Sequence, residues 1–294
     1  MLLIYSINNN VLYTLNYINI VVIEYLELVK KEGRRRGLSN KTIITYCNCV
    51  DKFFRFNKKD PRKINKNDIR EYLDLLLDKS RSGNTINVNL NAIKFLLKDV
   101  LGKRVTVNIK FSKVPKRLPT VLTKEEIKIL INSIENEKHK LMVQLMYSAG
   151  LRVSELLNLK VQDLELEKNY GFVRGGKGNK DRMFIIARKI KEDLTGLIEK
   201  DKLENYLFYS NRKMPYNIRT LQEIVRKAAK DSKIRKKVSC HTLRHSFATH
   251  LIEDGYSINE VQSLLGHKSP ETTLVYVHAA SPNMIKVKSP LDRL

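Results

Sequence analysis

Three side chains near the end of the chain have the types needed to attack a phosphate ester: an imidazole, a guanidinium and a phenol. His241 and Arg244 are three residues apart, so a helix would present both on one face. Arginine donates hydrogen bonds in a planar fork that matches phosphate oxygens, and it stays charged at any working pH. A tyrosine hydroxyl, here that of Tyr276, becomes a covalent nucleophile when a neighbouring base and cations help it to lose its proton.

Turn signals predict that helix ends bring these residues together. Gly266 follows an apolar pair as a helix-ending glycine does, which places His267 in the loop beyond it. The run Ser269-Pro270-Glu271 has the N-cap residue, the first-position proline and the first-turn acid of a new helix. Tyr276 would then lie about two turns into that helix.

Further polar residues complete an ordered pattern along the second half of the chain. The order is Arg152 … Lys177 … His241-x-x-Arg244 … Gly266-His267 … Tyr276, with the flanking runs 148–156 (SAGLRVSEL) and 241–250 (HTLRHSFATH). This pattern resembles that of the tyrosine recombinases, the lambda-integrase family, and most closely its Xer-type and archaeal members. The resemblance is close over the C-terminal part of the chain and extends to the earlier part in outline.

The resemblance implies a covalent exchange of DNA strands. Tyr276 would attack a backbone phosphodiester, which gives a 3′-phosphotyrosyl bond and a free 5′-hydroxyl. Arg152 and Arg244 would bind the non-bridging oxygens and stabilise the charge that develops on them. Lys177 would protonate the departing 5′-oxygen, because an alkoxide leaves poorly without a proton.

Three more residues receive roles from the same resemblance. His241 would be the general base for the nucleophile, His267 would hydrogen-bond the phosphate, and Glu155 would orient its neighbours. These groups supply the charge stabilisation and the proton transfers, and one phosphoester replaces another. We therefore expect no metal ion, no ATP and no other cofactor.

The implied partner is double-stranded DNA that carries a specific recombination site. Two duplexes, each cut by two subunits, imply a homotetramer on DNA, and a monomer or dimer when free. The task would be chromosome dimer resolution or the integration and excision of an element. A type IB topoisomerase, which rejoins the same strand, and a DNA-binding accessory protein with an inert site are the alternatives.

Two other kinds of site fit the residues poorly. His241 and His245 have the spacing of zinc ligands beside Cys240, but the glutamate of a zinc hydrolase and a second ligand pair are missing. Lys177 lies in a glycine-rich run close to a nucleotide-binding P-loop, but Gly178 stands where a Ser or Thr should hold magnesium. In the family the position of His245 is not a central catalytic one, so the predicted site excludes it.

Composition agrees with a nucleic-acid-binding protein of two domains. The 294 residues include 55 Lys and Arg against 31 Asp and Glu, and the net charge is +24. Both halves are basic, which suggests that both bind a polyanion, although a lysine-rich solvated surface is the alternative explanation. Three unpaired cysteines, no long apolar run and no basic start before Lys30 predict a soluble cytoplasmic protein, associated with the nucleoid and not with a membrane.

The first part of the chain is expected to be all-helical. Residues 1–19 form an extension whose role the sequence does not indicate, and residues 20–104 form a core-binding (SAM-like) domain by resemblance. Apolar spacing predicts helices over 21–32, 39–56, 68–77 and 85–100, with Gly33 ending the first helix and residues 34–36 in a turn. The expected phosphate contacts are Arg34, Arg35, Arg36, Lys41, Arg81, Lys94 and Lys98.

The second part is expected to be a catalytic domain with helices and a small β-sheet. A basic, proline-containing linker over 105–120, with Lys113, Lys116 and Arg117 as further DNA contacts, would let the two domains close around a duplex. The catalytic domain spans 121–294, with a tail from 277 that would dock on a neighbouring subunit. A hairpin over 170–186 would present Lys177 at its tip. The predicted fold is mostly α with a small β-sheet.

Overall fold

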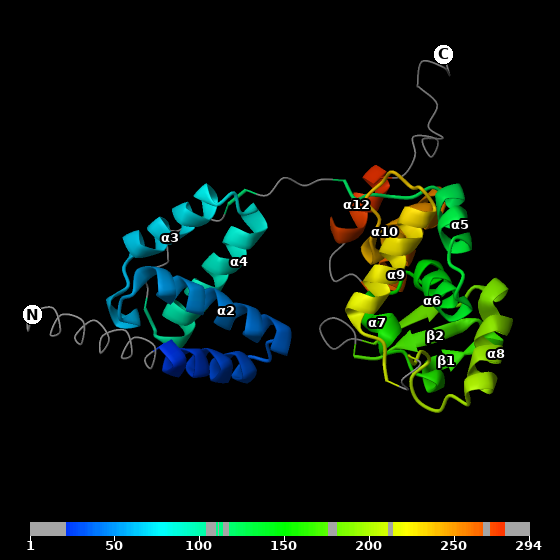
Figure 1. Ribbon diagram of the computed structural model, residues 1–294, viewed down its shortest axis with the longest axis horizontal. Coiled ribbons are helices and arrows are strands. Elements are labelled where there is room, and N and C mark those ends of the chain that lie inside the picture. The colour runs from blue at the N-terminus through cyan, green and yellow to red at the C-terminus, as the bar shows by residue number, and fades with distance from the viewer. Residues whose placement is uncertain are drawn as a thin grey trace, which may run out of the picture. The chain divides into compact units, whose positions relative to one another are not determined.

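The chain divides into two compact units, Met1–Lys116 and Arg117–Leu294, which are described separately. The computed structural model describes residues 22–103, 110, 112–113, 118–175, 181–210, 214–266 and 271–279 (Figure 1). The expected 1–19 extension, most of the linker and residues 280–294 lie outside the described residues. The described part is mostly helical with one small sheet, so the predicted fold class is confirmed.

The first unit packs its helices around one apolar core. Phe53, Phe54, Leu90 and Ile93 are among its fully buried side chains. Ser39, Asn65 and Ser82 accept backbone N–H groups at three helix starts, which satisfies donors that a helix leaves unpaired. The elements are the helix 22–35, α2 (Asn40–Asn57), the 3₁₀ turn η1 (Pro61–Lys63), α3 (Lys66–Asp78), α4 (Gly83–Lys94) and the π-helical turns η2 (Phe95–Val100).

The sequence predicts that the first helix ends at Gly33, but the helix continues past this residue. It continues to residue 35, and the chain turns at Gly37, which has a φ of +65°. A Cβ atom at Gly33 would lie 2.8 Å from Cγ1 of Ile43, so glycine here permits close packing of the first helix against α2. Arg34 and Arg35 are therefore helical and not in the turn.

In the part that the structure describes, the second unit combines eight α-helices with a three-stranded antiparallel sheet. The strands β1 (Leu164–Glu165), β2 (Tyr170–Val173) and β3 (Arg182–Ile185) lie in the order β1-β2-β3, with Val173 opposite Arg182. The predicted hairpin is confirmed, and β1 is an addition. The helices are α5 (Lys124–Asn132), α6 (Glu137–Ser148), α7 (Val153–Leu157), α8 (Lys191–Asp201), α9 (Ile218–Asp231), α10 (Cys240–Glu253), α11 (Ile258–Leu265) and α12 (Glu271–Ala279).

Helix α10 lies at the centre of the second unit and packs against α6, α9, α11 and α12 (Figure 1). Leu243 faces the main core, while Phe247 packs in a smaller cluster with Leu265 and Tyr276. The buried Ser246 hydroxyl accepts the backbone N–H of Leu122 at 2.9 Å, which anchors the start of the unit to α10. Helix α12 continues to Ala279, so the first three residues of the predicted tail are helical.

Candidate active site

Helix α10 carries three of the polar side chains that form the candidate site. Its N-cap is Ser239, whose side chain accepts the backbone N–H of Thr242. His241 is exposed, Arg244 is only 3% exposed, and His245 is half-buried. The helix therefore supplies one buried guanidinium and two imidazoles, and the two imidazole ring centres are 6.3 Å apart.

Arg152 enters the site from the junction between α6 and α7. It occupies the N-cap position of α7, and its backbone N–H donates to Oε2 of Glu155 at 2.9 Å. Its guanidinium forms a salt bridge with the other oxygen of the same carboxylate. Arg152 is thus held by Glu155 at both its backbone and its side chain, as a paired structural arginine would be, while its side chain keeps 21% of its surface exposed.

Glu155 is a buried carboxylate with arginines on several sides. Nη2 of Arg182 donates to it at 2.7 Å, and Nη1 of Arg244 lies 3.7 Å away. Burial raises the pKa of the Glu155 carboxyl, but Arg182, the backbone N–H of Arg152 and the Arg152 guanidinium outweigh it, so the pKa lies below its usual value. Glu155 is therefore ionised at neutral pH, and these three guanidiniums together carry more charge than it neutralises.

Arg244 is fixed by backbone carbonyl groups from two other segments. Nη1 donates to the carbonyl oxygen of Gly150, and Nη2 donates to that of Leu265 at 2.6 Å. Burial, followed by the charge of Arg152, lowers the pKa of Arg244 to about 10, which leaves it charged at neutral pH. The guanidinium is thus oriented before any ligand binds.

Tyr276 lies on α12 with its hydroxyl beside these cations. The side chain is 3% exposed, and the hydroxyl lies 3.1 Å from Nδ1 of His245. Burial raises the pKa of the Tyr276 phenol, whereas Arg244, which also hydrogen-bonds it, and Arg152 act in the opposite direction. The phenol is therefore buried but not isolated from the arginines, and it is protonated in the free protein.

His245, which the predicted site excludes, is in contact with Tyr276. Its ring centre lies 5.5 Å from that of Tyr276, and burial, then His241 and Arg244, lower the pKa of His245 to about 4. His241 also has a lowered pKa, caused by burial and then by Arg244 and Arg152. The spacing of four, which places both histidines on one face of a helix, is the sequence signal for this proximity.

The structure brings together Arg152, Glu155, His241, Arg244 and Tyr276 from four elements. Lys177 and His267 lie outside the described residues, so their expected positions stay predictions. The neighbouring parts are described: Arg182 begins β3 at the base of the hairpin, and Gly266 ends α11 with a φ of +62°. Within the described residues, no cluster of three or more His, Cys, Asp or Glu side chains could hold a metal ion.

Comparison with known proteins gives this geometry a family. The model of the phage integrase family matches residues 120–282, more than half of the chain, and that of the phage integrase N-terminal SAM-like domain matches residues 25–107. The chain belongs to the phage integrase family. It is a tyrosine recombinase, an enzyme of the class that cleaves and rejoins DNA strands.

Its relatives include Xer-type recombinases from archaea and bacteria. The chain is 35% identical to tyrosine recombinase XerA of Pyrococcus horikoshii over 264 residues, with 88% of each chain covered. It is 34% identical to tyrosine recombinase XerD of Halalkalibacterium halodurans over 284 residues, covering 89% of this chain and 93% of the relative.

Solved structures show the same fold. A crystal structure of XerA recombinase is 32% identical, with a TM-score of 0.54 and coverage of 93% of this chain and 99% of that one. A lambda integrase tetramer bound to a Holliday junction is 20% identical, with a TM-score of 0.72 and coverage of 86% and 76%. At that identity the second likeness establishes the fold alone.

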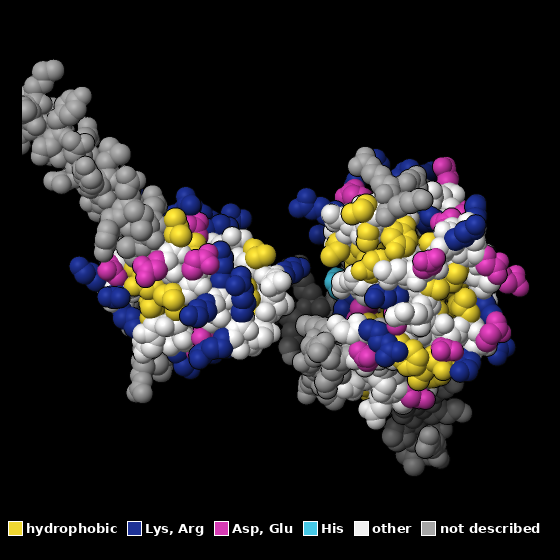
Figure 2. Space-filling model, turned by 90° about the horizontal axis from the view of Figure 1, so that it is seen from below, with side chains coloured by type: hydrophobic (Ala, Val, Ile, Leu, Met, Phe, Trp, Pro, Cys, Tyr) yellow, Lys and Arg dark blue, Asp and Glu magenta, His cyan; other side chains and the backbone are white. Residues whose placement is uncertain are grey.

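The predicted DNA contacts of the recombinase's first unit lie mainly on its surface. Figure 2 shows Lys and Arg side chains spread over the visible face of this unit, with acidic side chains among them. Two candidates already have acidic partners: Arg35 and Arg36 both pair with Glu32, and Arg36 also lies 3.3 Å from Asp99. Lys116 and Arg117 lie outside the described residues. The exposed candidates are Arg34, Arg35, Arg36, Lys41, Arg81, Lys98 and Lys113, and Lys94 is partly exposed.

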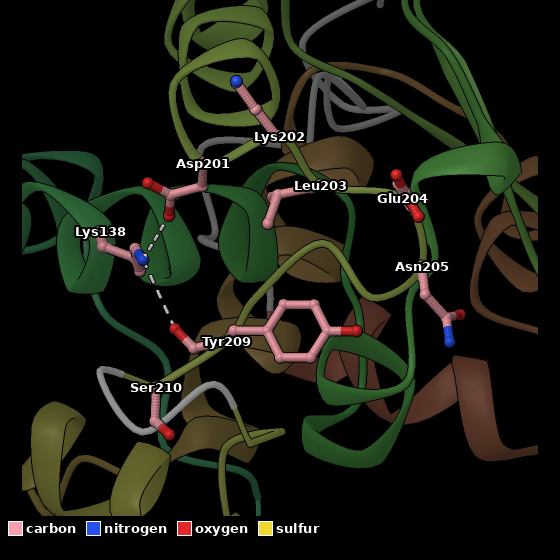
Figure 3. A pocket seen from close by; sticks show the side chains of 8 residues that line it. All are labelled: Lys138, Asp201, Lys202, Leu203, Glu204, Asn205, Tyr209 and Ser210. Carbon is pink, nitrogen blue, oxygen red and sulfur yellow. Dashed lines mark hydrogen bonds and ion pairs between the residues drawn. The ribbon is translucent and has the colours of Figure 1, made fainter.

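A polar hollow on the recombinase's second unit contains none of the predicted site residues (Figure 3). Lys138 donates to Asp201 at 2.7 Å and points toward the backbone carbonyl of Tyr209. Two of the charged groups that line the hollow, Lys138 and Asp201, are thus already paired with each other. No helix in the described part of the chain has the length and apolar character to cross a membrane.

Proposed function

We propose that this protein is a site-specific recombinase that cuts and rejoins DNA through a 3′-phosphotyrosyl intermediate. The observation that carries the proposal is the place of the Tyr276 hydroxyl, 3.1 Å from Nδ1 of His245 and close enough to Arg244 for that charge to lower the pKa of the phenol. A phenol between a neutral imidazole and a fixed guanidinium has both a proton acceptor and a cation beside it, as a covalent nucleophile requires.

Cleavage transfers a phosphoryl group from the DNA to the protein. The Tyr276 oxygen attacks phosphorus, the bond from phosphorus to the 5′-oxygen breaks, and the phenolic proton moves to a histidine. Arg152 and Arg244 bind the non-bridging oxygens, where their charge counts more in the transition state than in the ground state. The excess positive charge around Glu155 supports this role, because an incoming phosphate would neutralise it.

Three proton carriers and a hydrogen-bond donor complete the proposed reaction. Lys177 gives a proton to the departing 5′-oxygen, and His267 donates a hydrogen bond to the phosphate. His241 is proposed as the general base, and the contact with Tyr276 adds His245 as the residue that holds the phenol and relays its proton. Rejoining is the reverse sequence with a new 5′-hydroxyl, so the ester bond is conserved and no ATP is consumed.

The proposed working form is a homotetramer on two DNA duplexes. Solved relatives support it: lambda integrase has been crystallised as a tetramer on a Holliday junction, and XerH bound to its difH substrate in a pre-cleavage complex. The proposed tasks are chromosome dimer resolution, as the Xer-type relatives suggest, or integration and excision of an element. The residues after Ala279 would dock on a neighbouring subunit.

The proposal is tested by trapping the covalent intermediate. Duplexes with randomised cores, each nicked close to the cleavage position so that the cut fragment diffuses away, are incubated with the protein in excess chelator and run on a denaturing gel. We expect a protein–DNA adduct that Tyr276→Phe abolishes and Arg244→Ala reduces at least about 100-fold. Tyr256→Phe is the matched control, because Tyr256 is 52% exposed and outside the site.

Two outcomes favour the alternatives. Efficient relaxation of a supercoiled plasmid that lacks any selected site would indicate a topoisomerase, and absence of an adduct on every duplex would indicate an accessory DNA-binding protein. An adduct that survives Tyr276→Phe would refute the assigned nucleophile, and an adduct that requires a divalent metal would refute the mechanism.

A further inference from the structure

A buried arginine that the predicted site does not include joins three elements of the second unit. Arg182 begins β3, and its side chain is only 8% exposed. Its Nη2 donates to Oε2 of Glu155 on α7 at 2.7 Å, and its Nη1 donates to the backbone carbonyl of Leu264 on α11. One guanidinium thus ties the hairpin to both helices.

Through Glu155, Arg182 is connected to the proposed phosphate-binding arginines. The Glu155 carboxylate also pairs with the Arg152 guanidinium and lies 3.7 Å from Nη1 of Arg244. Arg182 occupies the same oxygen, Oε2, that accepts the backbone N–H of Arg152. The orientation of this carboxylate, and with it that of Arg152, therefore depends on Arg182.

Arg182 also holds the point at which the chain leaves α11 toward Tyr276. Arg182 and Arg244 donate to adjacent carbonyl groups, those of Leu264 and Leu265, at the C-terminal end of the helix, where carbonyls lack helical partners. A Cβ atom at Gly266 would lie 2.6 Å from Cδ of Arg182, so the aliphatic stem packs directly against that turn. The next described helix is α12, which carries Tyr276.

Burying the Arg182 guanidinium costs free energy, which indicates that this side chain does more than fill space in the core. Nε of Arg182 is buried and has no hydrogen-bond partner among the residues that the structure describes, and burying an unpaired donor on a cation is unfavourable. A methionine or leucine would fill the same volume without that cost. What the apolar side chains cannot do is bind the carboxylate and the helix end at once.

We propose that Arg182 is a positioning residue for strand cleavage. It fixes the Glu155 carboxylate, and so the Arg152 guanidinium, relative to the segment that carries the nucleophile. The proposal rests on the proposed function for its catalytic consequence, but its structural consequence is measurable in the free protein without DNA.

The first test is amide hydrogen exchange of the DNA-free full-length protein. In Arg182→Met, we expect residues 258–279 to exchange at least about tenfold faster, because the end of α11 loses one of its two guanidinium contacts. Arg182→Lys should give an intermediate rate, since one ammonium group reaches only one of the two acceptors. Arg174→Met is the matched control: Arg174 follows β2 at the same end of the hairpin but pairs with Asp163 and Asp181.

The second test is the single-turnover rate of adduct formation at saturating protein. We expect Arg182→Met to lower this rate at least about tenfold while DNA affinity stays within about threefold, because misplacing a catalytic group slows the reaction more than it weakens binding. Arg182→Lys should react at a rate between those of Arg182→Met and the wild-type protein. Arg174→Met should react at the wild-type rate.

The pH dependence of that rate separates positioning from general destabilisation. The charged groups that face Glu155 are Arg152, Arg182 and Arg244. Without Arg182 the pKa of Glu155 rises, so Arg182→Met should lose activity at a higher pH than the wild-type protein as the solution is acidified. A change that only loosened the fold would lower the rate equally at all these pH values.

Unchanged exchange over residues 258–279 in both Arg182 variants would overturn the inference, as would a rate loss that matches a loss of DNA binding. Should Arg182→Met not fold, the exchange and rate of Arg182→Lys decide in the same way. If the wild-type protein gives no adduct on any duplex, the proposed function fails, and the exchange experiment still judges the positioning role.

Discussion

His245 on α10 and Tyr276 on α12 contact each other, and this contact gives the proposed nucleophile a defined resting position. Nδ1 and the hydroxyl are 3.1 Å apart, and the low pKa of His245 keeps its imidazole neutral at physiological pH. A neutral imidazole can accept the phenolic proton, whereas a protonated one cannot. The same helix face also carries His241, whose ring centre lies 6.3 Å from that of His245.

Protonation of His245 should destabilise the protein as the pH falls. Its pKa is about 4 in the folded chain and about 6.5 when unfolded, so the unfolded state binds more protons between these values, and stability is lost on acidification through this range. In His245→Asn an amide replaces the imidazole Nδ1. Between pH 7 and pH 5 the free energy of unfolding of this variant should fall by about 1 kcal/mol less than that of the wild-type protein, a difference that includes a reduction for the partial exposure of the His245 ring. Urea unfolding at the two pH values measures the difference.

His241, His139 and His250 titrate in the same direction in both proteins, so they cancel in that comparison. Glu155 has a lowered pKa and titrates at more acidic pH. Equal acid sensitivity of His245→Asn and the wild-type protein would show that the His245 ring is readily protonated in the folded state.

Neutralising Glu155 should be costly, because it leaves buried guanidiniums without their carboxylate. We expect Glu155→Gln to lower the free energy of unfolding at pH 7 by about 3 kcal/mol, in the range seen when one partner of a buried ion pair is removed. Urea denaturation measures this loss. Glu260→Gln is a suitable control, because Glu260 is an exposed helix-capping acid whose loss should cost much less than that of the buried Glu155.

At this scale, the sequence allowed the prediction of residues whose type and order form a motif. Arg152, Arg244 and Tyr276 were predicted from their order and flanking words, and the structure brings them together. Arg182 and His245 were not, because their importance depends on what lies across the fold: a carboxylate 27 positions away in sequence for Arg182, and a phenol 31 positions away for His245. A single sequence does not display such distant pairs.

Among the elements, the junction of α6 and α7 is the most sensitive to a small change. Gly150 has a φ of +58°, and a Cβ atom there would lie 2.4 Å from Cδ1 of Phe247 on α10. Its carbonyl also accepts a hydrogen bond from Arg244. Backbone conformation and packing therefore both require glycine at this position, two residues before Arg152.

Gly150→Ala should destabilise the protein by about 3 kcal/mol, the combined effect of left-handed backbone strain and crowding of Phe247. Gly255→Ala is the matched control, because Gly255 has a φ of +95° but no atom within 4 Å of a new Cβ. In Gly255→Ala only the backbone strain should lower the free energy of unfolding, by about 1 to 2 kcal/mol. Urea unfolding midpoints compare the two, and equal losses would contradict the crowding by Phe247.

Helix positions were largely predictable because capping residues mark them. Thr123, Ser39 and Ser239 each stand at the N-cap of a helix, with their side chains accepting backbone N–H groups. The errors occur where tertiary packing decides. The helix continues through Gly33 because Ile43 packs against it, and the end of the fourth predicted helix is π-helical over Phe95–Val100.

For the whole molecule, the distribution of charge favours DNA binding by both units. Residues 1–116 carry 23 basic and 10 acidic side chains, and residues 117–294 carry 32 and 21. The excess of +13 in the smaller unit and +11 in the larger one was evident from the sequence. The sequence did not indicate which of the basic side chains are available to contact phosphates. In the structure, for example, the candidates Arg35 and Arg36 are both paired with Glu32.

Binding of the full-length protein to duplex DNA should weaken steeply with salt. Log K falls by about 0.9 per neutralised phosphate for each decade of salt, so 6 to 10 contacts would reduce affinity by about 10³ to 10⁵ between 50 and 200 mM. Fluorescence anisotropy titrations give the slope. A flat response would contradict binding by two basic units, and Arg34→Ala should reduce the slope by about one if that exposed side chain meets a phosphate.

The three cysteines have a practical consequence for following this protein in motion. Cys47, Cys49 and Cys240 are all buried, and burial raises the pKa of each thiol, that of Cys240 to about 11. Maleimide dyes will therefore spare the native thiols, and no cysteine-free background is needed. One surface cysteine introduced into each unit would accept a donor and an acceptor fluorophore, and energy transfer between them would report whether the two halves approach each other when a duplex is added.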